Sequence, residues 1–108
     1  MEVDNVKIKI TAIKQFSPKD IIGEDFIREN GQKIEKCGYG QEGRSWIMEN
    51  DWSMPEGFCH HAFFGLYKNI SVLRNEGNFS SWTGKDKIYT CCPDGIRPVV
   101  FLVERIED

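Results

Sequence analysis

Four cysteines are the residues of this sequence best suited to chemistry: Cys37, Cys59, Cys91 and Cys92. A thiolate is both a nucleophile and a soft metal ligand, so four of them could hold zinc or an iron–sulfur cluster. Each cysteine lies where we expect one element of secondary structure to end. Side chains from separate segments can converge at such ends, and all four cysteines are therefore candidate metal ligands.

The spacing of the cysteines leaves two other interpretations open. The chain has no C-x-x-C pair, although structural zinc sites usually take two ligands from such a knuckle. Adjacent strand residues point to opposite faces, so Cys91 and Cys92 can share a metal only if the strand breaks between them, a break that the following Pro93 would favour. The preferred interpretation is that the cysteines are small, buried hydrophobic side chains. The third alternative is thiol chemistry at Cys59 or at the 91–92 pair.

Two histidines, His60 and His61, directly follow Cys59. Either imidazole could replace one thiolate as a metal ligand. The partial positive charge at a helix N-terminus would also favour a thiolate at Cys59. Adjacent helical residues project about 100° apart, so a thiol–imidazole pair would instead need Cys91 or Cys92 from across the fold. We expect the histidines to form a surface pair in the first turn of a helix.

A glycine-rich segment, residues 38–43, matches the pattern G-x-G-x-x-G of dinucleotide-binding turns. That pattern binds phosphates only between a strand and a helix of a βαβ unit. Here residues 44–48 are more typical of a strand, and the chain is too short for a doubly wound domain. We therefore predict a turn that needs positive φ rather than a nucleotide site.

Asp94 and Arg97 flank Gly95 in a segment typical of a turn. The two side chains could form an ion pair that shapes the turn, or Arg97 could be offered to an anionic ligand. The structural role is preferred because Asp-Gly is common turn chemistry. Two interpretations are also open for the three tryptophans: they could close the core, or they could line a pocket or an interface.

The longest motif is Cys-Cys-Pro-Asp-Gly-x-Arg-Pro-Val at residues 91–99. With segments 37–40, 54–59 and 103–106, this motif resembles a family of uncharacterised bacterial and archaeal proteins of about 100 residues. The resemblance covers nearly the whole chain. It implies one fold unit, and it leaves function open because the family has no established activity.

Hydrophobic periodicity predicts the strands that must position these residues. Alternation over residues 6–13 is typical of a half-buried strand. Val99, Phe101 and Val103 should face one side of a later strand, and its other side is apolar as well. A strand that is apolar on both faces is either central or covered by a helix or a partner chain. Further strands are expected at residues 44–48, 87–91 and 98–106.

One main helix is predicted over about residues 58–74, because an apolar stripe recurs at intervals of three or four residues. Ser17 and Pro18 indicate a short helix start, and residues 79–86 are expected to be a loop. The predicted fold class is α+β. We expect one small, mainly antiparallel sheet to pack against the main helix, with the N- and C-terminal strands in the same sheet.

Composition limits the function classes. The 108 residues, 40% hydrophobic, suit a single domain over residues 1–108. A net charge of −3 with no basic segment argues against binding of nucleic acid. No apolar run approaches the roughly 20 residues of a membrane span, and the N-terminus lacks the pattern of a signal peptide. We therefore expect a cytoplasmic protein with reduced cysteines and no membrane partner.

The sequence contains no recognisable catalytic pattern, so an enzyme is not the favoured interpretation. The preferred function is a non-enzymatic binding or assembly module that forms a homo-oligomer, because one strand is apolar on both faces. One alternative is an accessory protein that binds zinc or an iron–sulfur cluster through the four cysteines. Another alternative is a thiol-dependent enzyme.

Overall fold

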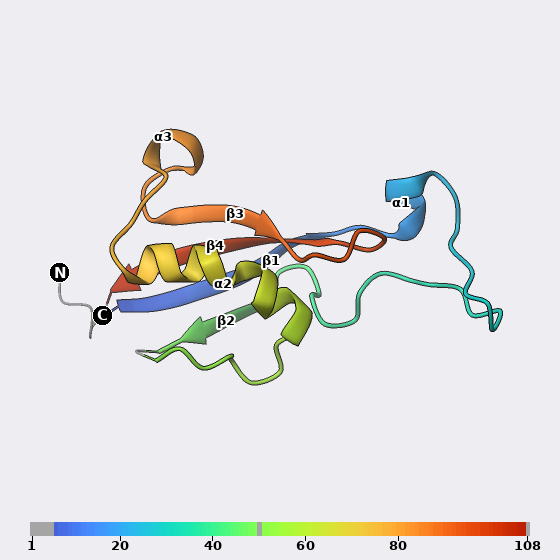
Figure 1. Ribbon diagram of the computed structural model, residues 1–108, viewed down its shortest axis with the longest axis horizontal. Coiled ribbons are helices and arrows are strands. Elements are labelled where there is room, and N and C mark those ends of the chain that lie inside the picture. The colour runs from blue at the N-terminus through green and yellow to red at the C-terminus, as the bar shows by residue number, and fades with distance from the viewer. Residues whose placement is uncertain (1–5, 50, 108) are drawn as a thin grey trace.

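A computed structural model describes residues 6–49 and 51–107, and it shows the expected α+β fold. Four antiparallel strands form one sheet in the order β2-β1-β4-β3 (Figure 1). The N- and C-terminal strands are the two central ones. The elements, in chain order, are β1 (Val6–Gln15), α1 (Pro18–Ile22), β2 (Ser45–Met48), α2 (His60–Arg74), α3 (Ser80–Thr83), β3 (Lys87–Cys91) and β4 (Val99–Glu107).

The pairing of β1 with β4 forms the centre of the sheet. Val6 pairs with Glu107 and Gln15 with Val99, and the register shifts between Ala12 and Lys14. The predicted alternation of β1 is confirmed, because its even-numbered residues from Val6 to Ala12 are buried. β4 is apolar on both faces, as expected. Its odd-numbered side chains from Val99 to Val103 lie in the core, while the alternate ones are half-buried on the opposite face.

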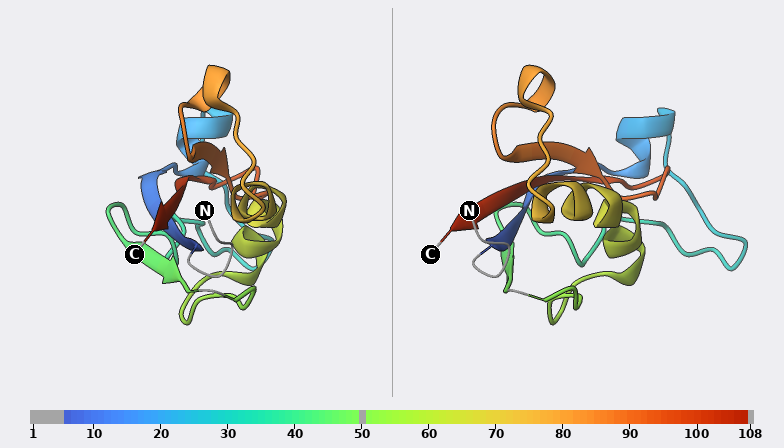
Figure 2. Two further views of the ribbon diagram at one scale, coloured as in Figure 1. Left: turned by 90° about the vertical axis from the view of Figure 1, so that its left-hand side faces the viewer. Right: turned by 60° about the vertical axis from the view of Figure 1, so that its left-hand side comes forward.

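Helix α2 covers one face of the sheet (Figure 2). It begins at His60 rather than at residue 58, and Cys59 is its N-cap residue. Its apolar stripe packs against β1, β3 and β4, and hydrophobic packing of this kind is the main stabilising contribution in a small domain. The buried residues of the stripe are Ala62, Leu66, Ile70 and Leu73.

The opposite face of the sheet has no helix on it in the part of the chain that the structure describes (Figure 2). Half-buried Leu102 lies there beside exposed Tyr89, its cross-strand neighbour on β3. Exposed Ile47 belongs to the same face, on β2. One face of the sheet therefore forms the core, and the other is a partly apolar surface.

Two arginines hold the C-terminal end of α2. Arg105 donates to the carbonyl of Leu73 at 2.8 Å and pairs with Asp86, and Arg74 donates to the carbonyl of Val6 at 3.0 Å. Both arginine side chains are buried. Cations near the last carbonyls of a helix interact favourably with its dipole, so these contacts fix α2 to the sheet at this end.

Two short helices, α1 and α3, flank the main elements of the fold. Ser17 caps α1 in a capping box with Asp20, and Pro18 is the first helical residue, as expected. The segment at 79–86 is not all loop, because it contains the four-residue helix α3. Too short for a periodic signal, α3 could not be recognised from hydrophobic spacing. None of the helices among the described residues is long and apolar enough to cross a bilayer.

Candidate functional site

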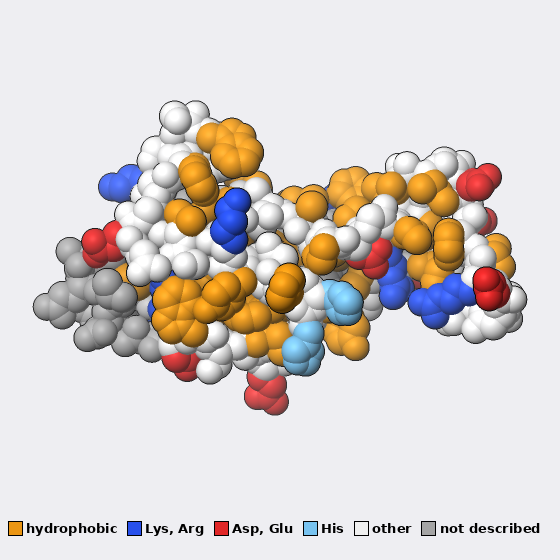
Figure 3. All heavy atoms as spheres, viewed as in Figure 1, with side chains coloured by type: hydrophobic (Ala, Val, Ile, Leu, Met, Phe, Trp, Pro, Cys, Tyr) orange, Lys and Arg blue, Asp and Glu red, His pale blue; other side chains and the backbone are white. Residues whose placement is uncertain are grey.

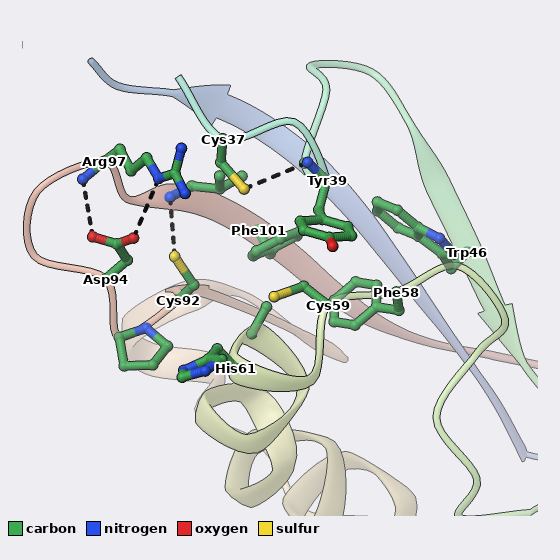
Figure 4. A pocket seen from close by; sticks show the side chains of 14 residues that line it. Cys37, Tyr39, Trp46, Phe58, Cys59, His61, Cys92, Asp94, Arg97 and Phe101 are labelled. Atoms are coloured by element: carbon green, nitrogen blue, oxygen red, sulfur yellow. Dashed lines mark hydrogen bonds and ion pairs between the residues drawn. The ribbon is translucent and has the colours of Figure 1, made fainter. Parts of the chain in front are cut away.

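A pocket of about 480 Å³ lies at the N-terminal end of α2, between this helix, β4 and the loops on either side (Figure 4). Its volume falls within the range of roughly 300–1,000 Å³ that is common for small-molecule sites. The pocket is built by segments that are far apart in the sequence. Its lining residues are Cys37, Tyr39, Gly40, Trp46, Phe58, Cys59, His61, Ala62, Cys92, Pro93, Asp94, Arg97, Val99 and Phe101.

Aromatic side chains form one wall of this pocket. Trp46 and Phe58 meet edge to face with ring centroids 4.7 Å apart, and Phe101 lies 5.5 Å from Phe58. These three rings are buried, so their positions are fixed by the core. Tyr39 stands at the mouth and is 60% exposed. The wall therefore offers a rigid, apolar surface for the flat face of a ligand.

Three of the four cysteines line the pocket: Cys37, Cys59 and Cys92 (Figure 4). Two of the sulfur atoms accept backbone hydrogen bonds. Cys37 Sγ accepts from the N–H of Tyr39 at 3.5 Å, and Cys92 Sγ accepts from the N–H of Val99 at 3.3 Å. Cys59, the N-cap residue of α2, is half-buried, and its sulfur has no hydrogen-bond partner among the described residues. Cys59 and Cys92 reach the pocket from element ends, as expected, whereas Cys37 reaches it from within the long loop between α1 and β2.

Cys91 lies outside this group. It is the last residue of β3, where side chains alternate, and it is exposed while Cys92 is buried. It pairs across the sheet with Val100, whose side chain belongs to the open face. The chain does not reverse this alternation at Pro93. The neighbouring thiols therefore belong to different environments, and only Cys92 faces the pocket.

The metal hypothesis stays a prediction. No group of three or more His, Cys, Asp or Glu side chains is placed to hold a metal ion within residues 6–49 and 51–107. Of the proposed ligands, Cys37, Cys59 and Cys92 share the pocket with His61, whereas Cys91 and His60 do not line it. Both histidines are exposed, in agreement with the surface pair that the sequence predicts (Figure 3).

Asp94 and Arg97 form the polar side of the pocket. Asp94 Oδ1 accepts the N–H groups of Ile96 at 2.9 Å and Arg97 at 3.1 Å, so the carboxylate shapes the turn as expected. Arg97 Nε lies 3.6 Å from Asp94 Oδ2. Burial alone would raise the pKa of Asp94, but these two N–H donors and the guanidinium outweigh it and lower this pKa. The pocket therefore carries one fixed charge of each sign.

The glycine-rich loop brings Cys37 and Tyr39 to the pocket. Gly40 packs against Val99, whose side chain lies 2.8 Å from where a Cβ of residue 40 would stand. Gly43 has the positive φ, +88°, that the sequence predicts for this turn. Strand β2 follows directly at Ser45, so the strand–turn–helix context of a dinucleotide fingerprint is absent from this segment.

Gln15, at the end of β1, holds the same loop in place. Its side-chain amide donates to the carbonyl of Cys37, and its backbone N–H donates to the carboxylate of Glu42 at 2.9 Å. These contacts tie both ends of the glycine-rich loop to the sheet. The loop that carries the first thiol is therefore anchored on the central strand β1.

Sequence reasoning missed the aromatic wall. It named Trp46 as a pocket or core residue but attached no role to Tyr39, Phe58 or Phe101. Trp46 does both, since it is buried and lines the pocket, and its Nε1 has no acceptor among the described residues. A buried N–H without a partner is uncommon in folded proteins and is costly. The alternation of β4 gave the only available signal, because it placed Phe101 on the core face.

Comparison of the chain with family models, with curated proteins and with solved structures found no match. The resemblance carried by residues 91–99 therefore stays a prediction. The site must be interpreted from its own geometry.

Proposed function

We propose that the protein is a non-enzymatic binding module that takes a small, largely apolar molecule in the pocket at the N-terminal end of α2. The observation that carries this proposal is the convergence of a rigid aromatic wall and a few polar groups on one cavity of ligand size. Known ligand sites combine these features, with an apolar lining for affinity and a few polar groups for orientation.

The chemistry of the lining favours a planar ligand with an anionic group. The rings of Trp46, Phe58 and Phe101 offer stacking and edge contacts to a flat molecule. At the polar side, the contacts of the Arg97 guanidinium among residues 6–49 and 51–107 are long, 3.6 Å to Asp94 and 3.5 Å to the carbonyl of Glu35. A guanidinium with such weak partners keeps donors for a carboxylate or sulfonate.

Binding of 1-anilinonaphthalene-8-sulfonate, an aromatic anion, tests this proposal. We expect saturable fluorescence enhancement at one site. The Cys59→Phe variant should abolish it by filling the pocket, whereas Cys91→Phe, the same change on the open face, should leave it intact. Loss of binding in the Cys91→Phe variant alone would contradict the proposal.

Nuclear magnetic resonance gives a second measurement that needs no variant. The indole N–H signal of Trp46 should shift on addition of the same probe, because Trp46 lines the pocket. The signals of Trp52 and Trp82 serve as internal controls, since neither lines it. A shift confined to Trp52 or Trp82 would place the binding site elsewhere.

The open face of the sheet supports a second function, self-association. Its apolar side chains are uncovered within the described residues, and a row of alternating charge crosses it from Lys9 to Glu104 to Lys87. A second copy turned by 180° and displaced by one strand can set the Glu104 carboxylate of each copy opposite one lysine of the other. The molar mass of the protein in solution tests this proposal.

A further inference from the structure

The three thiols of the pocket carry an inference about what it binds. Cys37, Cys59 and Cys92 reach this cavity from three separate segments, and their sulfur atoms line it together with the aromatic wall (Figure 4). We propose that the pocket is a thiol-exchange site in which Cys59 attacks a low-molecular-weight disulfide that carries an aromatic ring. The inference rests on the proposed function and names the chemical class of its ligand.

Cys59 is the thiol with the geometry of an attacking group. The sulfur atoms of Cys37 and Cys92 each accept a backbone N–H, and Cys92 is buried. Cys59 is half-buried, and no described group donates to its sulfur. The 15-residue helix α2 starts beside it without a side-chain cap.

The aromatic wall selects the partner. An aromatic disulfide can lay one ring against Phe58 and Phe101, which brings its sulfur pair to the part of the pocket where Cys59 lies. Arg97 on the polar side can receive a carboxylate on that ring. An aliphatic disulfide without a ring or a charge gains neither contact, so the pocket should discriminate between the two.

The reaction balances as one thiol–disulfide exchange. The Cys59 thiol releases its proton to solvent, and its sulfur attacks one sulfur of the disulfide. The bond between Cys59 and that sulfur forms while the original S–S bond breaks. The second half of the disulfide leaves as a thiolate. The disulfide is the oxidant, and no other co-reactant is needed.

The rates of modification by 5,5′-dithiobis(2-nitrobenzoate), an aromatic dicarboxylate disulfide, test this proposal. Peptide mapping after timed quenching follows each cysteine, and exposed Cys91 is an internal reference. Exposure alone would make Cys91 react first. We expect Cys59 to react roughly ten-fold faster than Cys91, with a rate that saturates as reagent is raised, because binding precedes the chemistry. Hydroxyethyl disulfide should show no such preference.

A Tyr39→Ala variant is a matched check on the pocket. Tyr39 is largely exposed at the mouth of the pocket, so its loss should leave the fold intact. The aromatic reagent should then react more slowly with Cys59, while its reaction with Cys91 stays unchanged. If Cys91 reacts first with both reagents and no rate saturates, thiol exchange in this pocket is wrong. Binding of the anilinonaphthalene probe in the same sample would then show that the ligand-binding proposal survives on its own. Absence of that binding would remove both proposals.

Discussion

Asp86 is a carboxylate whose ionisation is coupled to the fold. It accepts from Asn78 Nδ2 at 2.9 Å and pairs with the guanidinium of Arg105. The hydrogen bond from Asn78 lowers the pKa of Asp86 below its usual value, burial opposes this effect, and Arg105 lowers the pKa further. Because Arg105 also holds the last turn of α2, the charge on Asp86 bears on the packing of that helix.

We predict that this carboxylate makes the protein less stable in acid. A depressed folded-state pKa adds stability above the unfolded value, about 4, and this contribution is lost as pH falls through the folded pKa. The Asp86→Asn variant should therefore show a smaller loss of unfolding free energy between neutral pH and pH 3 than the wild type. Urea titrations at several pH values measure it. An unchanged pH dependence would show that other carboxylates are responsible.

At the scale of elements, α2 is held at its C-terminal end by two buried cations, and its N-terminal end borders the pocket. Arg105 reaches the carbonyls of Leu73 and Gly77 at 2.8 and 3.3 Å, and Arg74 reaches that of Val6. Burial lowers the pKa of Arg74, an effect that the charge of Asp51 partly offsets. Such groups lose hydration on folding, so their hydrogen bonds must replace it.

We predict that Arg105→Met lowers the unfolding free energy by about 2–3 kcal/mol, because it orphans helix carbonyls and leaves Asp86 without its cation. The matched control is Arg28→Met. Arg28 is exposed and bonded to Gln32, so its loss should cost within about 0.5 kcal/mol. Equal losses in the two variants, measured by chemical denaturation, would contradict the role assigned to Arg105.

The elements were largely predictable from the sequence, whereas the pocket was only partly so. Alternation over residues 6–13 and the stripe of α2 report burial directly, because each side chain must face either core or water. The pocket depends on how distant loops meet, and no local pattern encodes this. The sequence placed cysteines at element ends, and alternation separated Cys91 from Cys92. It gave no sign that Tyr39 would reach the same cavity.

At the scale of the whole molecule, the sheet has one filled face and one open face. The open face carries Tyr89 beside Leu102, and Ile47 lies apart from them, next to Lys9. The apolar part of this face is the pair of Tyr89 and Leu102, and uncovered apolar surface can mark an interface. Self-association through this face would bury β4 on both sides.

We predict that the protein is a dimer by light scattering and that Tyr89→Glu converts it to a monomer with an unchanged circular dichroism spectrum. Tyr89 is on an edge strand and half exposed, so the substitution should not unfold the chain. Phe64→Glu is the control. Phe64 is 85% exposed on α2, away from the open face, and its replacement should leave the dimer intact. A wild-type monomer at all concentrations, or dissociation by Phe64→Glu, would contradict this interface.

The pairing of Val6 with Glu107 has a consequence during synthesis. Strand β4 lies between β1 and β3, so β3 has no partner in the sheet until residues 99–107 have left the ribosome. Until then β1 lacks its β4 partner, and the core lacks the buried side chains of β4. Long-range pairing of this kind delays folding and leaves apolar strands exposed to other chains. A polypeptide that stops before Val99 therefore loses a central strand of its sheet together with Phe101, one ring of the aromatic wall of its pocket.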